Sequence, residues 1–341
     1  MKIASISTTK NESDIIEAFV RHNARFVDAF FFIDESVDAT RTILGRLQAE
    51  GFDITVLDST STVYEQRMLI TSALRIVDGL NAFDWVVLLD ADEILPDVPR
   101  PQFEQVLAGV GPTMLASMPW QTFVPTSRDY HRFNDPLVEN FLPRNTEGPQ
   151  GPIPKIAVPR ALFGVPVIDP GNHGAQHGGQ GGILPAQGVP LRLGHFPVRS
   201  TDQIVVKNIV AAHVTSMKES KTQLEGWHVY ASLDQMRANN FDMPYEELLR
   251  TALTYAIADA PPGLGIDRGA APIRARPLEM KYRDLRYRSP LAALDREMEA
   301  MARLVVQHRR ATTHSRQALR DAQARLGEAL ATLDGTQSKS A

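Results

Sequence analysis

The sequence predicts an α/β protein organised around a parallel sheet. Four short apolar runs near the N-terminus are separated by three stretches of helical periodicity, which is the rhythm of parallel strands connected by helices. Each of the four runs ends in a polar cluster, and acids close three of the four. The fourth run, Trp85–Leu89, has no polar alternation, as expected for a strand buried on both faces of a sheet.

The elements of this first part can be assigned in order. Strands are expected at 3–7, 29–33, 52–57 and 85–89. Asn11 is placed to cap the helix that follows the first strand, and Asp38 is placed to cap a helix that continues to Glu50. Gly51 suits the left-handed position after that helix, and a further helix over 63–77 ends at Gly79.

Three carboxylates, those of Asp90, Asp92 and Glu93, stand where the fourth strand leaves the sheet. Buried carboxylates need a cationic partner, and ligands bind at the carboxyl ends of the strands in an open α/β sheet. Asp90 and Asp92, two residues apart on a turning backbone, can converge on one hard divalent cation and leave positions open for phosphate oxygens. The competing interpretation is a solvated acidic turn after a core strand.

The composition is that of a soluble globular protein of 341 residues, with 43% hydrophobic and 22% charged residues. The net charge is −4, which gives no indication of a nucleic-acid surface. The absence of cysteine excludes disulfides, thiolate metal sites and cysteine nucleophiles, and fits a reducing compartment. With no signal peptide and no apolar run of membrane-spanning length, a cytoplasmic location is expected.

The usual phosphate-binding loops are missing from the sequence. No G-x-G-x-x-G follows the first strand, and no glycine-lysine loop of the Walker type occurs. If a nucleotide binds at this edge of the sheet, a metal ion rather than a glycine-rich loop has to neutralise its diphosphate. This requirement again indicates Asp90 and Asp92.

The second part of the chain is less regular. Strands are expected at 114–118, 153–158, 165–168 and 191–196, and helices at 99–110, 201–217, 224–236 and 245–258. The Ala-, Arg- and Leu-rich stretch 290–333 has one apolar stripe, from Leu291 to Val305. We interpret it as a helix docked on its own domain rather than as a coiled coil, because the pattern fades beyond His308.

Three motifs together resemble a known family. They are Lys10-Asn11-Glu12, the loop Asp34–Thr40, and Leu88–Leu95 with its two aspartates. In order and spacing they are similar to GT-A glycosyltransferases of family 2, in the bacterial branch that has a K-N-E turn and an L-D-x-D-E metal motif. The resemblance covers 1–97 well. It continues more thinly at Trp120, Val138–Phe141, Lys155, Gly171–His173, His195–Ser200 and Lys207.

The resemblance implies a GT-A, Rossmann-like nucleotide-diphospho-sugar transferase fold and an inverting glycosyltransferase. It implies a nucleotide-diphosphate sugar as donor, Mn²⁺ or Mg²⁺ as cofactor, and a glycan or glycolipid acceptor in bacterial surface polysaccharide assembly. The expected domain is 1–220, with a nucleotide-binding half (1–97) and an acceptor half (98–220). A helical extension (221–334) and a disordered tail (335–341) are expected to follow.

The resemblance also assigns roles to residues of the metal and nucleotide sites. Asp34 is expected against the base, Asp90 near the ribose or metal, and Asp92 as the principal metal ligand. His195 is a candidate third metal ligand or phosphate contact. The full set expected to bind the nucleotide sugar is Thr8, Lys10, Glu12, Asp34, Asp38, Arg67, Asp90, Lys155 and Arg199. One departure is Asp34-Glu35-Ser36, which stands where the family often has Asp-Asn-Gly-Ser.

Transfer also needs a general base and a positive group for the departing diphosphate. Glu139, an acid inside an apolar run, is the first choice for the base, and Asp135 and Asp169 are the reserves. Lys155 and Arg199 are the candidates for the diphosphate, against the alternative of ordinary solvated charges. Two histidines of the glycine-rich stretch, His173 and His177, can join the site if that loop closes.

Other readings compete with the transferase. A haloacid-type phosphatase also ends a strand in Asp-x-Asp, but expects Thr or Val where Ile94 stands, and expects the motif after its first strand. A nucleotidyltransferase or sugar-nucleotide hydrolase would use the same sheet, although a nucleotidyltransferase usually has a glycine-rich loop after its first strand. A non-catalytic glycan-binding or assembly subunit is the third alternative. The C-terminal helices are candidates for homodimerisation or for peripheral contact with a membrane surface.

Overall fold

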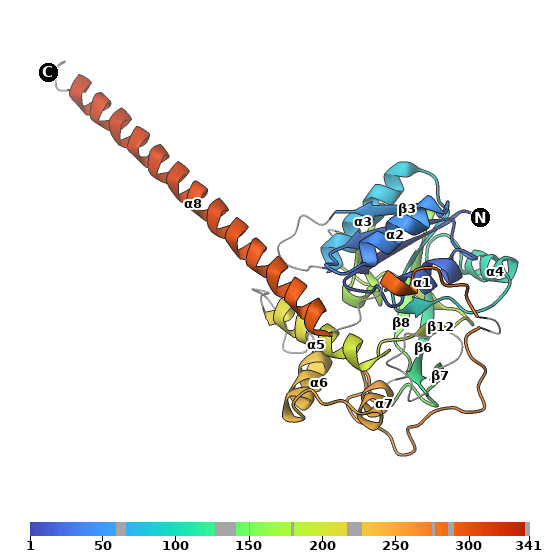
Figure 1. Ribbon diagram of the computed structural model, residues 1–341. Helices are drawn as coiled ribbons and strands as arrows, with labels where there is room; N and C mark the ends of the chain where they lie inside the picture. The colour runs from blue at the N-terminus through green and yellow to red at the C-terminus, as the bar shows by residue number, and fades with distance from the viewer. Residues whose placement is uncertain are drawn as a thin grey trace. The chain divides into compact units, whose positions relative to one another are not determined.

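The structure, a computed structural model (Figure 1), places eight ranges of the chain. The described residues are 1–58, 66–126, 141–149, 151–178, 181–216, 227–274, 277–285 and 290–337. The chain divides into two compact units, Met1–Leu294 and Asp295–Ala341. The described part of 221–294 therefore belongs to the same unit as the sheet, and the predicted division of the chain at residue 220 stays a prediction.

The first unit contains a ten-stranded mixed sheet with the order β3-β2-β1-β4-β8-β6-β12-β5, and β7 and β11 pair with β6. Its strands are β1 (Ile3–Thr9), β2 (Ala29–Asp34), β3 (Ile54–Leu57), β4 (Trp85–Leu88), β5 (Glu93–Ile94), β6 (Leu115–Pro125), β7 (Phe141–Pro143), β8 (Pro154–Pro159), β11 (Ala186–Gly188) and β12 (Leu193–His195). A separate hairpin pairs β9 (Pro166–Ile168) with β10 (Ala175–His177). The strands β1 to β4 are parallel to one another, so the predicted α/β class is confirmed.

The α-helices lie close to the predicted positions. They are α1 (Ile16–Asn23), α2 (Thr40–Ala49), α3 (Gln66–Leu80), α4 (Arg100–Val110), α5 (Thr201–Ser216), α6 (Trp227–Ala238), α7 (Tyr245–Leu253) and α8 (Pro290–Gln337). Short 3₁₀ turns lie at Arg160–Leu162, Pro170–Asn172 and Arg283–Leu285. Gly51 has the expected positive φ of 101°, two residues beyond the end of α2.

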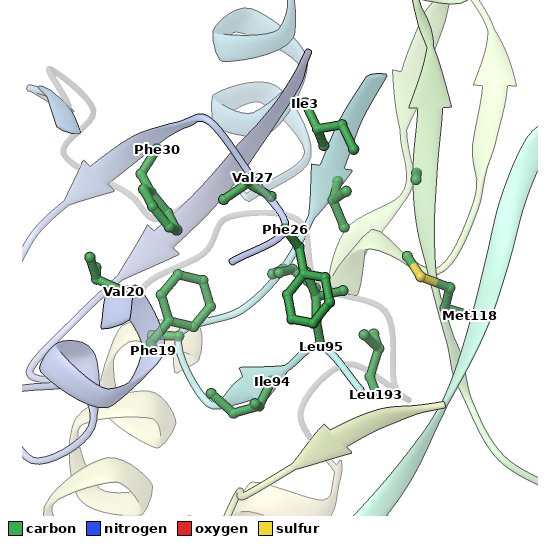
Figure 2. Close-up of a cluster of buried hydrophobic side chains, with 14 of the residues drawn as sticks. Ile3, Phe19, Val20, Phe26, Val27, Phe30, Ile94, Leu95, Met118 and Leu193 are labelled. Carbon is green, nitrogen blue, oxygen red and sulfur yellow. The ribbon is translucent and has the colours of Figure 1, made fainter. Parts of the chain in front are cut away.

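The hydrophobic core lies on both faces of the parallel strands, because successive side chains of a strand point to opposite faces. Phe30 and Phe32 of β2 pack on one face with α1, α2 and α4, whereas Phe31 packs on the other face with α3. Figure 2 shows part of the first cluster, where Phe19 of α1 lies close to Phe30 and Ile94. Strands buried on both faces explain why the sequence shows apolar runs without alternation.

The second half of the sheet brings the acidic turn beside a histidine. β8 is antiparallel to both β4 and β6, so it joins the two halves of the sheet. β12 runs parallel to β6, and β5 pairs with β12 so that Glu93 lies opposite His195. Residues that are far apart in sequence therefore meet at the carboxyl end of β4.

One capping prediction is wrong. Asn11 does not cap α1, which has no side-chain cap. Its backbone has a positive φ of 58°, and its side-chain oxygen accepts hydrogen bonds from the backbone N–H groups of Val37 (2.9 Å) and Asp38 (3.3 Å). Asn11 instead connects the loop after β1 to the loop after β2.

Two residues at the end of α1 hold the chain just beyond the acidic turn. The His22 Nε2–H donates to the carbonyl of Leu95 at 2.7 Å, and its Nδ1 accepts from Arg274 at 3.0 Å. Asn23 accepts from the N–H of Leu95 at 3.0 Å and donates to the carbonyl of Glu93 at 3.3 Å. These bonds fix the backbone that carries the acids against a helix of the core.

His22 makes the fold sensitive to acid. Burial lowers the pKa of His22 to about 3 from an ordinary value of 6.5, so the unfolded chain takes up this proton first as the pH falls. The contribution of neutral His22 to stability is complete above pH 6.5 and is lost as the pH falls toward 3. Between pH 6.5 and 5 the loss should be about 2 kcal/mol. Denaturant unfolding at pH 7 and pH 5 should show a smaller difference in His22→Gln than in the wild type. Equal differences would contradict the assignment.

Beyond α7 the chain is less helical than expected. The helix predicted for 245–258 ends at Leu253. The described residues from there to 285 form irregular chain with one 3₁₀ turn. Ile273, Leu278 and Tyr282 of this segment pack against the hydrophobic cluster that contains Phe30 and Phe32. In α8, the stripe expected to be docked is 70% exposed at Met298 and 51% exposed at Val305. No helix among the described residues has the length and apolar character needed to cross a membrane. The homodimer through the C-terminal helices stays a prediction.

Candidate active site

The acidic turn after β4 sends its two aspartates to different partners. Asp90 forms a short ion pair with Lys155 of β8, and it also accepts from Gln66 at 3.2 Å and Asn172 at 3.4 Å. Asp92 forms an ion pair with Lys207 of α5 at 2.8 Å. The expectation that Asp90 and Asp92 both need cations is met by two lysines from separate elements.

Lys155 is a buried charge between two acids. Its Nζ lies 3.1 Å from Glu93 as well as against Asp90, and 5.9 Å from the Trp120 ring centroid. Burial disfavours its charge, but Asp90 and Glu93 raise its pKa above the usual range. Burial raises the pKa of Glu93 to about 8, and Glu93 also accepts the backbone N–H of Asp90 at 2.9 Å. Lys155 and Glu93 therefore hold the side chain and the backbone of Asp90 in place.

Arg199 is the second buried cation. It binds Asp14 through two nitrogens, at 2.7 and 2.9 Å, and also pairs with Glu12 and donates to the carbonyl of Phe196. Its Nη1 is 3.7 Å from Asp92. Burial raises the pKa of Glu12 to about 7 despite Arg199. Bidentate pairing and burial make Arg199 the anchor between the loop after β1 and the end of β12.

Accessibility separates the cations. The side chains of Lys155 and Arg199 are 1% and 3% exposed, whereas that of Lys207 is 32% exposed. Burial disfavours charge on Lys207, but Asp92 outweighs it and raises its pKa above the usual range. Burial likewise opposes charge on Asp92, but Lys207 and Arg199 hold its pKa below the usual range. Of these three cations, Lys207 is the one that a ligand can reach directly.

His195 lies beside Asp92 among aromatic rings. Its Nε2 is 4.0 Å from Asp92 Oδ1, and its ring stacks on Trp120 with centroids 4.1 Å apart. Tyr255, from the chain after α7, meets it edge-on at 5.5 Å. Burial lowers the pKa of His195 to about 3, so the imidazole is neutral at pH 7. A neutral imidazole is the form that binds metal ions.

The loop after β2 is held by hydrogen bonds. Asp34 Oδ1 accepts from Thr9 at 2.8 Å and Ser36 at 2.6 Å, while its Oδ2 is buried without a hydrogen-bond partner among the described residues. Asp38 accepts from Thr40 and from the backbone N–H of Ser13. Asp34 thus has one carboxylate oxygen without a partner among the described residues, whereas both oxygens of Asp38 accept hydrogen bonds and join two loops.

The remaining predicted residues lie around this centre. Thr8 is 3.4 Å from Gln66, and Lys10 is half-buried in the loop after β1. Gln176 connects Arg67 to Asp169, at 3.3 and 2.8 Å. Asp169 therefore lies at the hairpin side of the site rather than among the ions of the acidic turn.

Two histidines of the glycine-rich stretch behave differently. The Nδ1–H of His173 donates to the carbonyl of Pro154 at 2.8 Å, and its ring meets Trp120 edge-on at 5.7 Å, so it lies at the site. His177 ends β10 and is exposed. The proposed base Glu139 and its reserve Asp135 lie outside the described residues, as does the rest of 127–140.

Sequence reasoning missed three contributors. Gln66, which donates to Asp90, belongs to no recognisable motif. Tyr255 and Arg144 lie in segments that the sequence analysis did assign, but nothing in the sequence indicates their contacts with each other or with His195. Asn172 was included in the resemblance at Gly171–His173 without a role, and in the structure, with a φ of 59°, it donates to Asp90. The Gly171-Asn172 dipeptide is a turn signal in the sequence that could have indicated this position.

The residues fit a divalent ion in part. Among the described residues no group of three or more His, Asp or Glu side chains is gathered as a metal site. Asp92 and His195 nevertheless present one carboxylate oxygen and one neutral imidazole nitrogen 4.0 Å apart, both of which are ordinary ligands for Mn²⁺ or Mg²⁺. Asp90 is directed to Lys155 instead. The geometry suits an ion that takes two ligands from the protein and the others from phosphate and water.

Comparisons with known proteins give structural likenesses alone. No family model matches the chain, and no curated protein matches its sequence. A mannosyltransferase from Pyrobaculum calidifontis, solved with GDP-Man and Mn²⁺, is 16% identical over 74% of this chain and 72% of its own, with a TM-score of 0.35. TarS residues 1–349 from S. aureus, solved with UDP, is 12% identical over 74% and 87%, also with a TM-score of 0.35.

A third similar structure is glucosyl-3-phosphoglycerate synthase from Mycobacterium tuberculosis, solved with Mn²⁺, UDP and glucosyl-3-phosphoglycerate. It is 18% identical over 48% of this chain and 59% of its own, with a TM-score of 0.27. Likenesses at these identities and TM-scores do not establish a family. What the site can do has to follow from its own residues, which place an accessible lysine, a charged aspartate and a neutral histidine at the carboxyl edge of a parallel sheet.

Proposed function

We propose that this protein is a metal-dependent, inverting glycosyltransferase that moves a sugar from a nucleotide-diphosphate donor to a glycan or glycolipid acceptor. The observation that carries the proposal is the group formed by Asp92, Lys207 and His195, with ion-pair and facing distances of 2.8 and 4.0 Å. It lies where the parallel strands end, the place at which α/β sheets bind nucleotides. The resemblance of the three sequence motifs adds the reaction class.

Each residue of this group has a role that its environment supports. Asp92 and His195 would hold the ion, which when bound neutralises part of the diphosphate charge. Lys207 carries a positive charge that is partly open to solvent, so it can bind the diphosphate as it leaves. Lys155 and Arg199, both buried and paired, position the acids and are not proposed to contact the donor directly.

The nucleotide end of the donor would lie along the loops after β1 and β2. The buried Oδ2 of Asp34 is an acceptor that lacks a partner among the described residues, as a contact to a base N–H requires. Gln66 and Asn172, which both donate to Asp90, would fix that carboxylate near the ribose. Arg67 and Asp169 would border the donor on the hairpin side.

Transfer with inversion requires one displacement. A carboxylate accepts the proton of the acceptor hydroxyl while its oxygen attacks the anomeric carbon, and the bond from that carbon to the diphosphate oxygen breaks with the electrons leaving on the diphosphate. Glu139 is proposed as this base on the sequence alone, with Asp135 and Asp169 as reserves. Bacterial surface polysaccharide assembly is the setting that the resemblance implies.

Calorimetric titration of UDP and GDP, with and without Mn²⁺, tests the proposal. One of the nucleotides should bind the wild type in a metal-dependent manner, and Asp92→Asn should weaken that binding about 100-fold or more. The matched control is Asp97→Asn, which removes an exposed carboxylate paired with Arg25 and should bind as the wild type does. Metal-independent binding, or equal binding by Asp92→Asn, would overturn the metal role. If neither binds, TDP and CMP donors are titrated next, and failure of all four would overturn the transferase.

A further inference from the structure

The chain after α7 contributes an aromatic ring to the site. Tyr255 lies two residues beyond the end of α7 and meets His195 at an interplanar angle of 67°, with centroids 5.5 Å apart. Trp120 stacks on the same imidazole at 4.1 Å and 16°. The imidazole therefore touches one ring from β6 and one ring from a segment that sequence reasoning placed in a C-terminal extension.

These rings replace the hydrogen bond that usually orients a ligand histidine. Such a histidine commonly donates its second ring N–H to a carboxylate or carbonyl. Here the second nitrogen, Nδ1, is buried and has no hydrogen-bond partner among the described residues. The orientation of the His195 ring then depends on its packing, and Tyr255 supplies one of its two aromatic neighbours.

The backbone of Tyr255 is fixed by a buried ion pair. Arg144 Nη1 donates to the carbonyls of Leu253 at 3.0 Å and Tyr255 at 2.8 Å, while its other nitrogens bind Glu147. Glu147 in turn accepts the backbone N–H of Thr122 at 2.7 Å and its hydroxyl at 2.9 Å. An arginine that is 3% exposed thus ties the chain after α7 to β6.

This linkage returns to His195. Thr122 is the residue of β6 that lies directly beside His195 of β12 in the sheet. Tyr255 is therefore connected to His195 twice, once through its ring and once through Arg144, Glu147 and Thr122. The next residue, Ala256, has a positive φ of 56°, a conformation that costs a non-glycine residue free energy and persists where surrounding contacts enforce it.

We propose that Tyr255 is a positioning residue that holds the imidazole of His195 toward Asp92, and that Arg144 holds Tyr255 in place through its backbone carbonyl. The inference rests on the proposed function in one respect: the positioned imidazole serves to bind the metal ion and, through it, the nucleotide. This positioning requires the aromatic ring of Tyr255 and does not require its hydroxyl.

Tyr255→Phe, Tyr255→Leu and Tyr282→Leu separate the possibilities. Tyr282 is the matched control, because it is another tyrosine of the C-terminal segment but packs against Arg21 and Arg46 and bonds to Glu50. In titrations of Mn²⁺ with UDP or GDP, Tyr255→Leu should bind about 10-fold more weakly than the wild type. Tyr255→Phe and Tyr282→Leu should bind within about 2-fold of the wild type.

A second readout needs no ligand. In ¹⁵N-correlated spectra of the histidine side chains, a signal absent from His195→Gln identifies His195, and stacking on Trp120 should give it a ring-current shift. Tyr255→Leu should change this shift and Tyr255→Phe should preserve it. An unchanged signal in Tyr255→Leu, or equal changes in both variants, would overturn the inference. Failure of the proposed function would instead appear as lack of nucleotide binding by the wild type, and leaves this spectroscopic test decisive.

Discussion

Replacing Arg199 with methionine should lower the free energy of unfolding by about 3–5 kcal/mol, the usual cost of removing one partner from a buried ion pair. Asp14 and Glu12 would lose their principal cation, and the carbonyl of Phe196 would lose a donor. The Arg199 side chain is 3% exposed, so water cannot replace these bonds. Urea denaturation at pH 7, followed by circular dichroism, measures the change.

Two variants control this result. Arg100→Met removes an arginine that pairs with Asp28 and Glu104 but is 31% exposed, and should cost no more than about 1 kcal/mol. Arg199→Lys keeps the charge but loses the bidentate geometry toward Asp14, so its stability should lie between those of the wild type and Arg199→Met. An Arg199→Met protein as stable as Arg100→Met would show that Arg199 is not an anchor.

Replacing Lys207 with methionine should lower kcat/KM for sugar transfer by about 10²–10³, the usual effect of removing one group that stabilises developing charge. The side chain of Lys207 is 32% exposed, unlike those of Lys155 and Arg199, and its Nζ lies 2.8 Å from Asp92. Most of the loss should appear in kcat, because the charge on the diphosphate oxygen grows as the bond to the sugar breaks. Steady-state kinetics with the donor identified by calorimetry measures both constants.

Lys281→Met is the control for this loss of charge. Lys281 also pairs with a carboxylate, that of Glu50, but lies on the surface with 49% of its side chain exposed, and its loss should leave kcat unchanged. Lys207→Arg should recover part of the activity. A rise in KM alone, with kcat equal to that of the wild type, would contradict a role at the leaving diphosphate.

The parallel half of the fold could be predicted from sequence because its signals are local. The apolar runs that form β1, β2 and β4 are buried on both faces, and the helices between the parallel strands have a helical apolar period. The boundaries were less secure, since β6 extends to Pro125 and α7 ends at Leu253. Strand and helix ends depend on pairing partners, which lie elsewhere in the chain.

The candidate site was predicted in composition but not in pairing. The family resemblance grouped Asp92 with His195 and included Lys207 without giving it a role. In the structure both side chains face Asp92, Lys207 at 2.8 Å and His195 at 4.0 Å. The assignment of the diphosphate to Lys155 and Arg199 could not be judged from sequence. Which lysine is buried and which is accessible depends on the strands and helices stacked around it.

The sequence by itself determined the parallel strands, the acids at their carboxyl ends and the need for cations to meet those acids. The tertiary structure decided that Asp90 pairs with Lys155 and Asp92 with Lys207. It also decided that the ring of Tyr255 meets His195 while Arg144 binds the backbone carbonyl of Tyr255. Hydrophobic period and helix signals act over a few residues, so one strand or helix at a time reveals them. The partners of these buried charges are chosen by desolvation and packing among segments that are distant in sequence, 65 residues for Asp90 and Lys155 and 115 residues for Asp92 and Lys207. No local pattern records such pairs.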